Sequence, residues 1–246
     1  MTHHSSMNQR NSAAIQHRPE RAPRPLTKAD FRIPALLLAL SAVPMLGGIL
    51  RLASFSEHVA HTVENARFRG SPLPILVHIA SVSIYCLLGA FQFSTPIRQR
   101  WPGWHRRAGK LLALCGFLVG LTGIWMTLFY PIPRALQGSL LYAVRLSVGA
   151  AMLVSIAMGW RRILQRDVRS HEAWMIRAYA LGQGAGTQVL VLLPWMLISG
   201  ESGGVTRDLL MTLSWMINIF VAESLIGWRR RSERGIRVGQ PARAAG

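Results

Sequence analysis

The residues that could do chemistry stand inside long apolar segments of the chain. His78 begins a polar stripe that continues through Ser81, Tyr85, Gly89 and Gln92 at intervals that return to one face of a helix. Polar side chains are costly within a membrane and normally face the interior of a helical bundle. The stripe is therefore expected to point inward, where it either bonds neighbouring helices or lines a site.

Arg145 lies inside another apolar segment, at about the depth expected for His78. Because a guanidinium keeps its proton, it either extends to the outer headgroups or holds an anionic or carbonyl group of a ligand. The second alternative predicts an outward-facing pocket formed by His78, Tyr85, Arg145 and Gln188. A third alternative is that an acid from the outer connections folds inward and pairs with the arginine, and the candidates are Glu57, Glu64, Glu201 and Asp208.

Two histidines begin separate helices on the opposite side of the predicted bundle. His105 and His171 could supply the two axial ligands of a b-type haem or contact a quinone, with Trp174 stacking beside them. The alternative is that both histidines are interfacial anchors that contact lipid headgroups. The sequence predicts no metal site, because neither cysteine has a partner at metal-ligand spacing.

Arg177 and Glu223 match in sign and in expected depth near that same side. They are predicted to form a structural ion pair buried between their helices. No nucleophile–base triad, phosphate loop or carboxylate-rich site accompanies them. Whether the protein is an enzyme therefore stays open at this point.

The elements that position these residues follow from composition. The chain has 246 residues, of which 50% are hydrophobic and 15% charged, whereas soluble domains carry about 25% charged residues. Six apolar segments are each long enough to cross a membrane. The sequence thus predicts an all-α, six-helix integral membrane bundle over 31–228, with a disordered tail at 1–30 and a basic tail at 229–246. The predicted helices cover 31–53, 73–93, 108–129, 139–160, 173–198 and 209–228.

The distribution of basic residues predicts the orientation. Most of the 28 lysines and arginines fall in the two tails and in the connections after the second and fourth helices. Positively charged connections stay in the cytoplasm, so both termini are expected there, in a bacterial inner membrane. The net charge of +18 is then explained by topology and by attraction to anionic headgroups at the cytoplasmic face, and not by nucleic-acid binding. The basic residues on the other side are Arg51, Arg67, Arg69, Arg134 and Arg207.

Four parts of the sequence carry a resemblance to a known family. They are His78, the segment GAFQF at 89–93, HRxxGK at 105–110 and HxxWMxR at 171–177. Together they resemble the bacterial predicted-membrane-protein family called domain of unknown function 2306, over about 72–198 and more weakly over the last helix. The resemblance implies a multi-helix membrane protein and no particular activity.

Three functions remain in view. The first is a haem- or quinone-linked membrane redox protein. The second is a binding or transport module for a small anion or a lipid, with the outward-facing polar pocket. The third is an accessory membrane subunit with no site of its own, and the sequence leaves its protein partners unknown.

Overall fold

The computed structural model describes residues 26–53, 55, 63–200 and 203–238. These residues form one short 3-10 helix and a series of α-helices, and no strand occurs among them. The elements are η1 (Lys28–Phe31), α1 (Arg32–Ala53), α2 (Val63–Gly70), α3 (Pro72–Gln92), α4 (Thr95–Arg100), α5 (Pro102–Phe129), α6 (Ser139–Leu164), α7 (Val168–Gly182), α8 (Gly184–Ser199) and α9 (Gly204–Val238).

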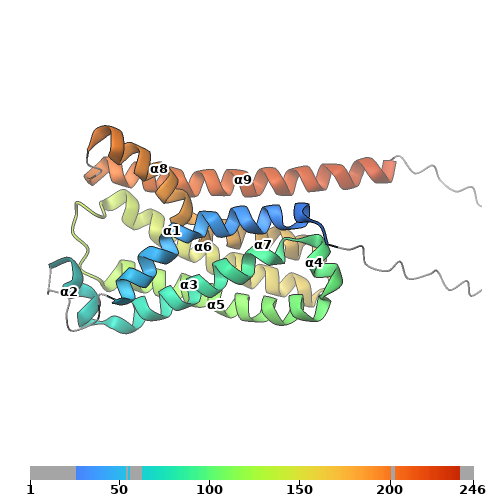
Figure 1. Cartoon of the computed structure of the whole chain (residues 1–246), viewed down its shortest axis with the longest axis horizontal. Helices are drawn as coiled ribbons and strands as arrows, with labels where there is room; N and C mark the ends of the chain where they lie inside the picture. The colour runs from blue at the N-terminus through green and yellow to red at the C-terminus, as the bar shows by residue number, and fades with distance from the viewer. Residues whose placement is uncertain (1–25, 54, 56–62, 201–202, 239–246) are drawn as a thin grey trace, which may run out of the picture.

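The long helices run along one common direction and form a bundle (Figure 1). The most extensive packing joins α3 to α5, α5 to α6, and α6 to α7, while α1 covers α3 and α8, and α9 covers α7 and α8. The start of α1 and the end of α9 lie at the same end of the bundle, and α2 lies at the opposite end (Figure 1). A chain that crosses the bundle an even number of times returns to the end at which it started, which agrees with this arrangement.

The outer surface of the bundle is apolar. Leu36, Leu197 and Phe220 are 71%, 79% and 73% exposed on three different helices, which water would disfavour and lipid tails accept. Among the described residues, five helices are long and apolar enough to cross a membrane, and the bent pair of α7 and α8 makes six if it counts as one crossing. The protein is thus an all-helical, multi-pass membrane protein.

The helix predicted over 173–198 is wrong as a single element, because the chain bends by 41° between α7 and α8. The bend lies at Gln183, which stands among glycines, and glycine disfavours a helix by about 1 kcal/mol relative to alanine. A Cβ atom at Gly184 would collide with the Trp215 indole, and one at Gly186 with the backbone of α1. The glycines therefore permit both the bend and the close approach of α9 and α1.

Other boundaries also differ from the predicted ones. α5 begins at Pro102 and not at 108, since proline suits the first turn of a helix. α9 continues to Val238 through much of the expected basic tail, and η1 lies within the expected N-terminal tail. Residues 1–25 and 239–246 of those tails lie outside the described residues.

Candidate functional site

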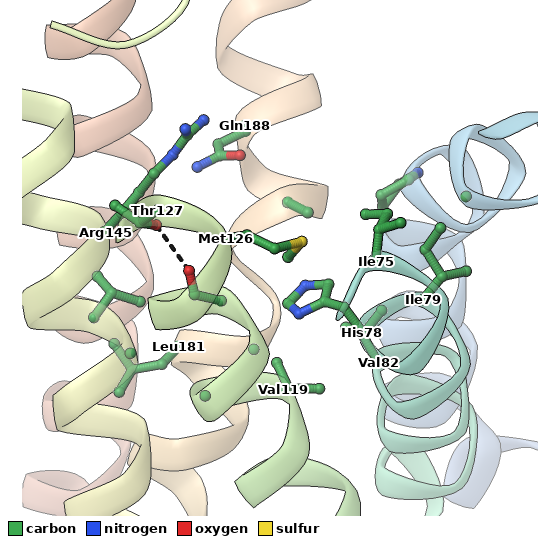
Figure 2. A pocket seen from close by; sticks show the side chains of 18 of the residues that line it. Ile75, His78, Ile79, Val82, Val119, Met126, Thr127, Arg145, Leu181 and Gln188 are labelled. Atoms are coloured by element: carbon green, nitrogen blue, oxygen red, sulfur yellow. Dashed lines mark hydrogen bonds between the residues drawn. The ribbon is translucent and has the colours of Figure 1, made fainter. Parts of the chain in front are cut away.

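A cavity of about 460 Å³ lies between α1, α3, α5, α6, the α7–α8 bend and α9. It extends to the end of the bundle that carries α2, where side chains of α2 and of the connection before α6 complete its wall. Figure 2 shows Arg145 and Gln188 toward one end of the cavity and His78 farther along it. Most of the remaining wall is apolar and includes Ile75, Val82, Val119, Met126, Val148 and Leu181.

Two arginines on the wall have no acidic partner among the described residues. Arg145 Nη1 donates a hydrogen bond to the neutral Oε1 of Gln137, which precedes α6. Arg207, at the start of α9, also lines the cavity, and its buried Nε makes no hydrogen bond with the described part of the chain. Arg67 of α2 adds a third guanidinium to the same wall. This end of the cavity is consequently rich in N–H donors and positive charge.

Asp208 is close enough to Arg145 to interact electrostatically, but its carboxylate serves another purpose. Its Oδ1 accepts a hydrogen bond from Gly138 N at 3.0 Å, and its Oδ2 accepts one from Leu141 N at 3.1 Å. These amides belong to the first turn of α6, whose N–H groups have no partner within the helix. Asp208 therefore caps α6 from α9. Glu57 and Glu201 lie outside the described residues, as does the side chain of Glu64.

Gln188 brings a second unsatisfied donor to the cavity. Its side chain is 9% exposed, and its Nε2 makes no hydrogen bond with the described residues. The neighbouring Thr187 instead donates to Asn218 Oδ1 at 2.7 Å, which ties α8 to α9. α8 thus holds the Gln188 amide in place without using its N–H groups.

His78 projects from α3 into the cavity, toward Met126 and Val119 (Figure 2). Its Nδ1 lies 2.9 Å from Thr122 Oγ1, on α5. The small residue Gly123 adjoins the ring, since a Cβ atom added there would lie 3.7 Å from His78 Cε1. The imidazole is therefore held on one side and faces open space on the other.

The deeper part of the cavity ends in a chain of hydrogen bonds that sequence reasoning missed. Ser41 Oγ donates to Gln183 Oε1 at 3.0 Å, Gln183 Nε2 donates to Tyr179 Oη at 2.8 Å, and Tyr179 Oη donates to Cys86 O at 2.9 Å. The chain joins α1, α7 and α3 at the bend. In the sequence, only Gln183, a polar residue among the glycines at 182–186, indicated this chain of hydrogen bonds.

Tyr85 does not join the cavity wall, although it was predicted to line the pocket. It is 5% exposed and packs in the core against Tyr179, with ring centroids 5.7 Å apart, and against Met152 and Ile156. Of the four predicted pocket residues, the structure places His78, Arg145 and Gln188 on one cavity.

His105 and His171 lie in the first turns of α5 and α7, at the end of the bundle opposite α2 (Figure 1). His171 Nδ1 lies 2.8 Å from Gly159 O, to which it donates, whereas the buried Nδ1 of His105 makes no hydrogen bond with the described residues. The two rings are near enough to interact electrostatically. Beside them the Glu172 carboxylate forms an ion pair with Arg229, and its Oε1 lies 3.7 Å from Arg98 Nη1. The described residues contain no cluster of three or more metal-ligating side chains.

Arg177 and Glu223 lie side by side on α7 and α9. Arg177 Nε donates to Glu223 Oε1 at 2.5 Å, and Nη2 donates to Oε2 at 2.9 Å. The guanidinium also covers the Trp174 ring, with its central carbon 4.7 Å from the ring centroid. The expectation that the pair is buried is wrong, because the two side chains are 26% and 47% exposed at the outside of the bundle.

One comparison with known proteins gives a match. The profile of the family described as "Predicted membrane protein (DUF2306)" matches residues 75–226, which is more than half of the chain. The matched range contains His78, Arg145, Gln188 and Arg207. No curated protein and no solved structure matches the chain.

Proposed function

We propose that this chain, which belongs to the DUF2306 family of predicted membrane proteins, binds an anionic amphiphile in the cavity between its helices. One observation carries the proposal. Arg145 and Arg207 line the same cavity, and no carboxylate of the described residues forms an ion pair with either guanidinium.

Placing these arginines inside the membrane costs free energy. A guanidinium in the middle of a spanning helix costs about 2.5–3.5 kcal/mol even on the lenient insertion scale, and the cost is lower for Arg145 and Arg207, which lie within the first two turns of α6 and α9. Asp208 offsets part of that cost at a distance, but both of its oxygens are engaged by backbone amides of α6. Gln137 offers a neutral oxygen only. A carboxylate or phosphate of a ligand would supply the missing negative charge and accept hydrogen bonds from both arginines.

The apolar wall supports an amphiphile over a small inorganic anion. The volume of about 460 Å³ lies within the range of about 300–1,000 Å³ of small-molecule sites. Beyond the arginines the wall consists largely of aliphatic side chains and methionines such as Val82, Val148 and Met152. An acyl or isoprenoid chain would fill this part of the cavity, and an inorganic ion would leave it empty.

The orientation belongs to the same proposal. With both termini in the cytoplasm of a bacterial cell, the cavity opens on the outer side of the inner membrane, and the basic end of the bundle meets anionic headgroups. A periplasm-dependent phosphatase fused after Gly246 is expected to be inactive. High activity of that fusion would reverse the orientation.

The binding proposal is tested on the full chain in phosphatidylcholine nanodiscs, with dodecanoate and dodecyl phosphate as probes. Arg145→Gln is expected to weaken binding by about 10- to 100-fold, because a charge-assisted hydrogen bond contributes about 1.5–3 kcal/mol. Arg134→Gln is the matched control, since Arg134 is exposed and lies outside the cavity. The proposal fails if neither probe saturates the wild-type protein, or if both variants bind alike.

A haem- or quinone-linked redox function is a second proposal. It is favoured by the proximity of His105 and His171 on α5 and α7, with Trp174 one turn farther along α7. A b-type haem would take an imidazole from each helix. A reduced-minus-oxidised absorption spectrum of the purified protein tests it, and the absence of a haem band after haem reconstitution would exclude the haem alternative.

A further inference from the structure

We infer that the ligand of the cavity is a hydroxylated acid, whose hydroxyl group donates a hydrogen bond to His78 Nε2. The inference rests on the proposed function and narrows the class of ligand. It depends on which nitrogen of His78 carries the proton and on what surrounds the other one.

The hydrogen-bond geometry of Thr122 favours the tautomer of His78 in which Nδ1 carries the proton. Thr122 has one hydroxyl proton, and its Oγ1 lies 2.5 Å from the carbonyl oxygen of Leu118, one turn earlier in α5. That carbonyl can only accept, so the Thr122 proton points toward it. The contact of 2.9 Å between Thr122 Oγ1 and His78 Nδ1 then requires Nδ1 to be the donor. In a neutral imidazole the proton on Nδ1 leaves Nε2 as an acceptor.

The Nε2 atom faces a wall that offers it no donor. No hydrogen-bond donor of the described residues contacts Nε2, since the hydrogen-bond contact of the ring is at Nδ1 and the backbone carbonyl of Val119 beside the imidazole can only accept. The side chains that surround the ring in Figure 2 are those of Val119, Met126 and Val82. Gly123 leaves space beside the ring. An acceptor in such surroundings loses hydrogen-bond energy unless a ligand or a water donates to it.

One part of the cavity therefore offers hydrogen-bond donors, and the other part offers an acceptor. Arg145, Arg207 and Gln188 present N–H donors, which select the oxygens of an acidic head. His78 presents an acceptor farther along the wall, which selects an O–H group (Figure 2). A simple fatty acid satisfies the first part only, whereas an acid with a hydroxyl group near its head satisfies both. The aliphatic remainder of the wall takes the chain.

The test compares dodecanoate with its 2-, 3- and 12-hydroxy derivatives, each titrated into the full chain in phosphatidylcholine nanodiscs. At least one hydroxy acid is expected to bind wild type about fivefold more tightly than dodecanoate, since a net hydrogen bond contributes about 1 kcal/mol. His78→Phe keeps a flat ring and removes the acceptor. This variant is expected to lose the preference for the hydroxy acid, measured as the ratio of the dissociation constants of dodecanoate and the hydroxy acid within the same variant.

Thr122→Val provides a second variant at a position away from the cavity wall. It removes the oxygen that accepts from His78 Nδ1, so nothing holds the proton on Nδ1 and Nε2 is no longer kept as the acceptor. The preference for the hydroxy acid is therefore expected to fall while dodecanoate still binds. Nitrogen-15 spectra of wild type are expected to show a protonated Nδ1 and an unprotonated Nε2 for His78.

The results of these titrations distinguish a failure of the hydroxyl assignment from a failure of the proposed anion binding. If dodecanoate binds and no hydroxy acid binds more tightly, a water satisfies His78 and the inference is wrong, while the proposed function stands. A preference that persists in His78→Phe also overturns the inference. If none of the acids binds the wild-type protein, the proposed function itself is wrong.

Discussion

Replacing Asp208 by asparagine should weaken the fold and strengthen anion binding at the same time. The carboxylate is 3% exposed and accepts hydrogen bonds from Gly138 N and Leu141 N through its two oxygens. The asparagine amide would keep one acceptor and turn an NH₂ group toward the other backbone amide, so one hydrogen bond would be replaced by two opposed donors. The negative charge near Arg145 would also disappear.

The expected loss of stability follows from these contacts. A hydrogen bond to a charged group contributes about 1.5–3 kcal/mol, and the carboxylate at a helix N-terminus adds up to about 1 kcal/mol. Asp208→Asn should therefore lower the free energy of unfolding by about 3 kcal/mol. Asp208 interacts electrostatically with Arg145, so its charge also repels an anion bound beside that guanidinium. Removing this repulsion is worth on the order of 1 kcal/mol, and dodecanoate should therefore bind about fivefold more tightly.

The chain contains its own reporter for the stability assay. Cys115 is a buried free thiol away from the cavity, so a thiol-reactive dye labels it only as the bundle opens, and Cys86, which lines the cavity, is replaced by serine in every protein compared. Unfolding is followed in mixed micelles with increasing dodecyl sulfate, and binding is followed in nanodiscs. Asp167→Asn is the matched control, because Asp167 caps α7 by accepting hydrogen bonds from Ser170 and its side chain is 37% exposed, whereas Asp208 is buried. If Asp208→Asn is as stable as this control, the carboxylate is not the cap. Weaker dodecanoate binding by the variant would refute the electrostatic argument.

Three further predictions concern other parts of the bundle. A double-mutant cycle with Arg177→Met and Glu223→Leu should give a coupling of about 1 kcal/mol, because the pair is bidentate but partly exposed; a value near zero would contradict the observed geometry. Gly186→Ala should lower the free energy of unfolding by about 1–3 kcal/mol through collision with α1, whereas Gly47→Ala, at an open site, should be neutral or slightly stabilising in the same thiol-labelling assay. The pKa of Asp167 lies below its ordinary value because the first-turn serine donates hydrogen bonds to it. The stabilisation that ionised Asp167 gives to the first turn of α7 is thus present above the pKa of the unfolded chain. It is lost as the pH falls below about 4. The protection factor of the amides in the first turn of α7, which is the intrinsic exchange rate divided by the measured rate at the same pH, should fall in that range, and a pH-independent protection factor would contradict the prediction.

The membrane-spanning helices were largely predictable because each depends on a local property. A run of about 20 apolar residues favours a spanning helix whatever its neighbours are, and the part of the chain that the structure describes contains five such helices plus one bent pair. The family was predictable for a similar reason, since short segments such as those at 105–110 and 171–177 identify it, and the match over 75–226 confirms that resemblance. Neither prediction required knowledge of which helix packs against which.

The break at Gln183 was not predicted, although its residues are visible in the sequence. Glycines inside a membrane helix accommodate either close packing or a bend. The choice depends on the helices that press against them, here α1 at Gly186 and α9 at Gly184. The hydrogen bond between Gln183 and Ser41 joins positions that are 142 residues apart, so no local pattern could indicate it.

The sequence by itself determined that His78, Arg145 and Gln188 are costly residues within apolar helices, which favours an inward orientation but leaves the headgroups as an alternative for Arg145. The tertiary structure decided what they face. His78 and Tyr85 share one stripe of α3, yet the first lines the cavity and the second is packed into the core. Arg207 and Asp208 are neighbours at the start of α9, yet one lines the cavity and the other caps α6. Helical periodicity specifies the direction of a side chain, whereas its partners depend on the packing of helices that are distant in the chain.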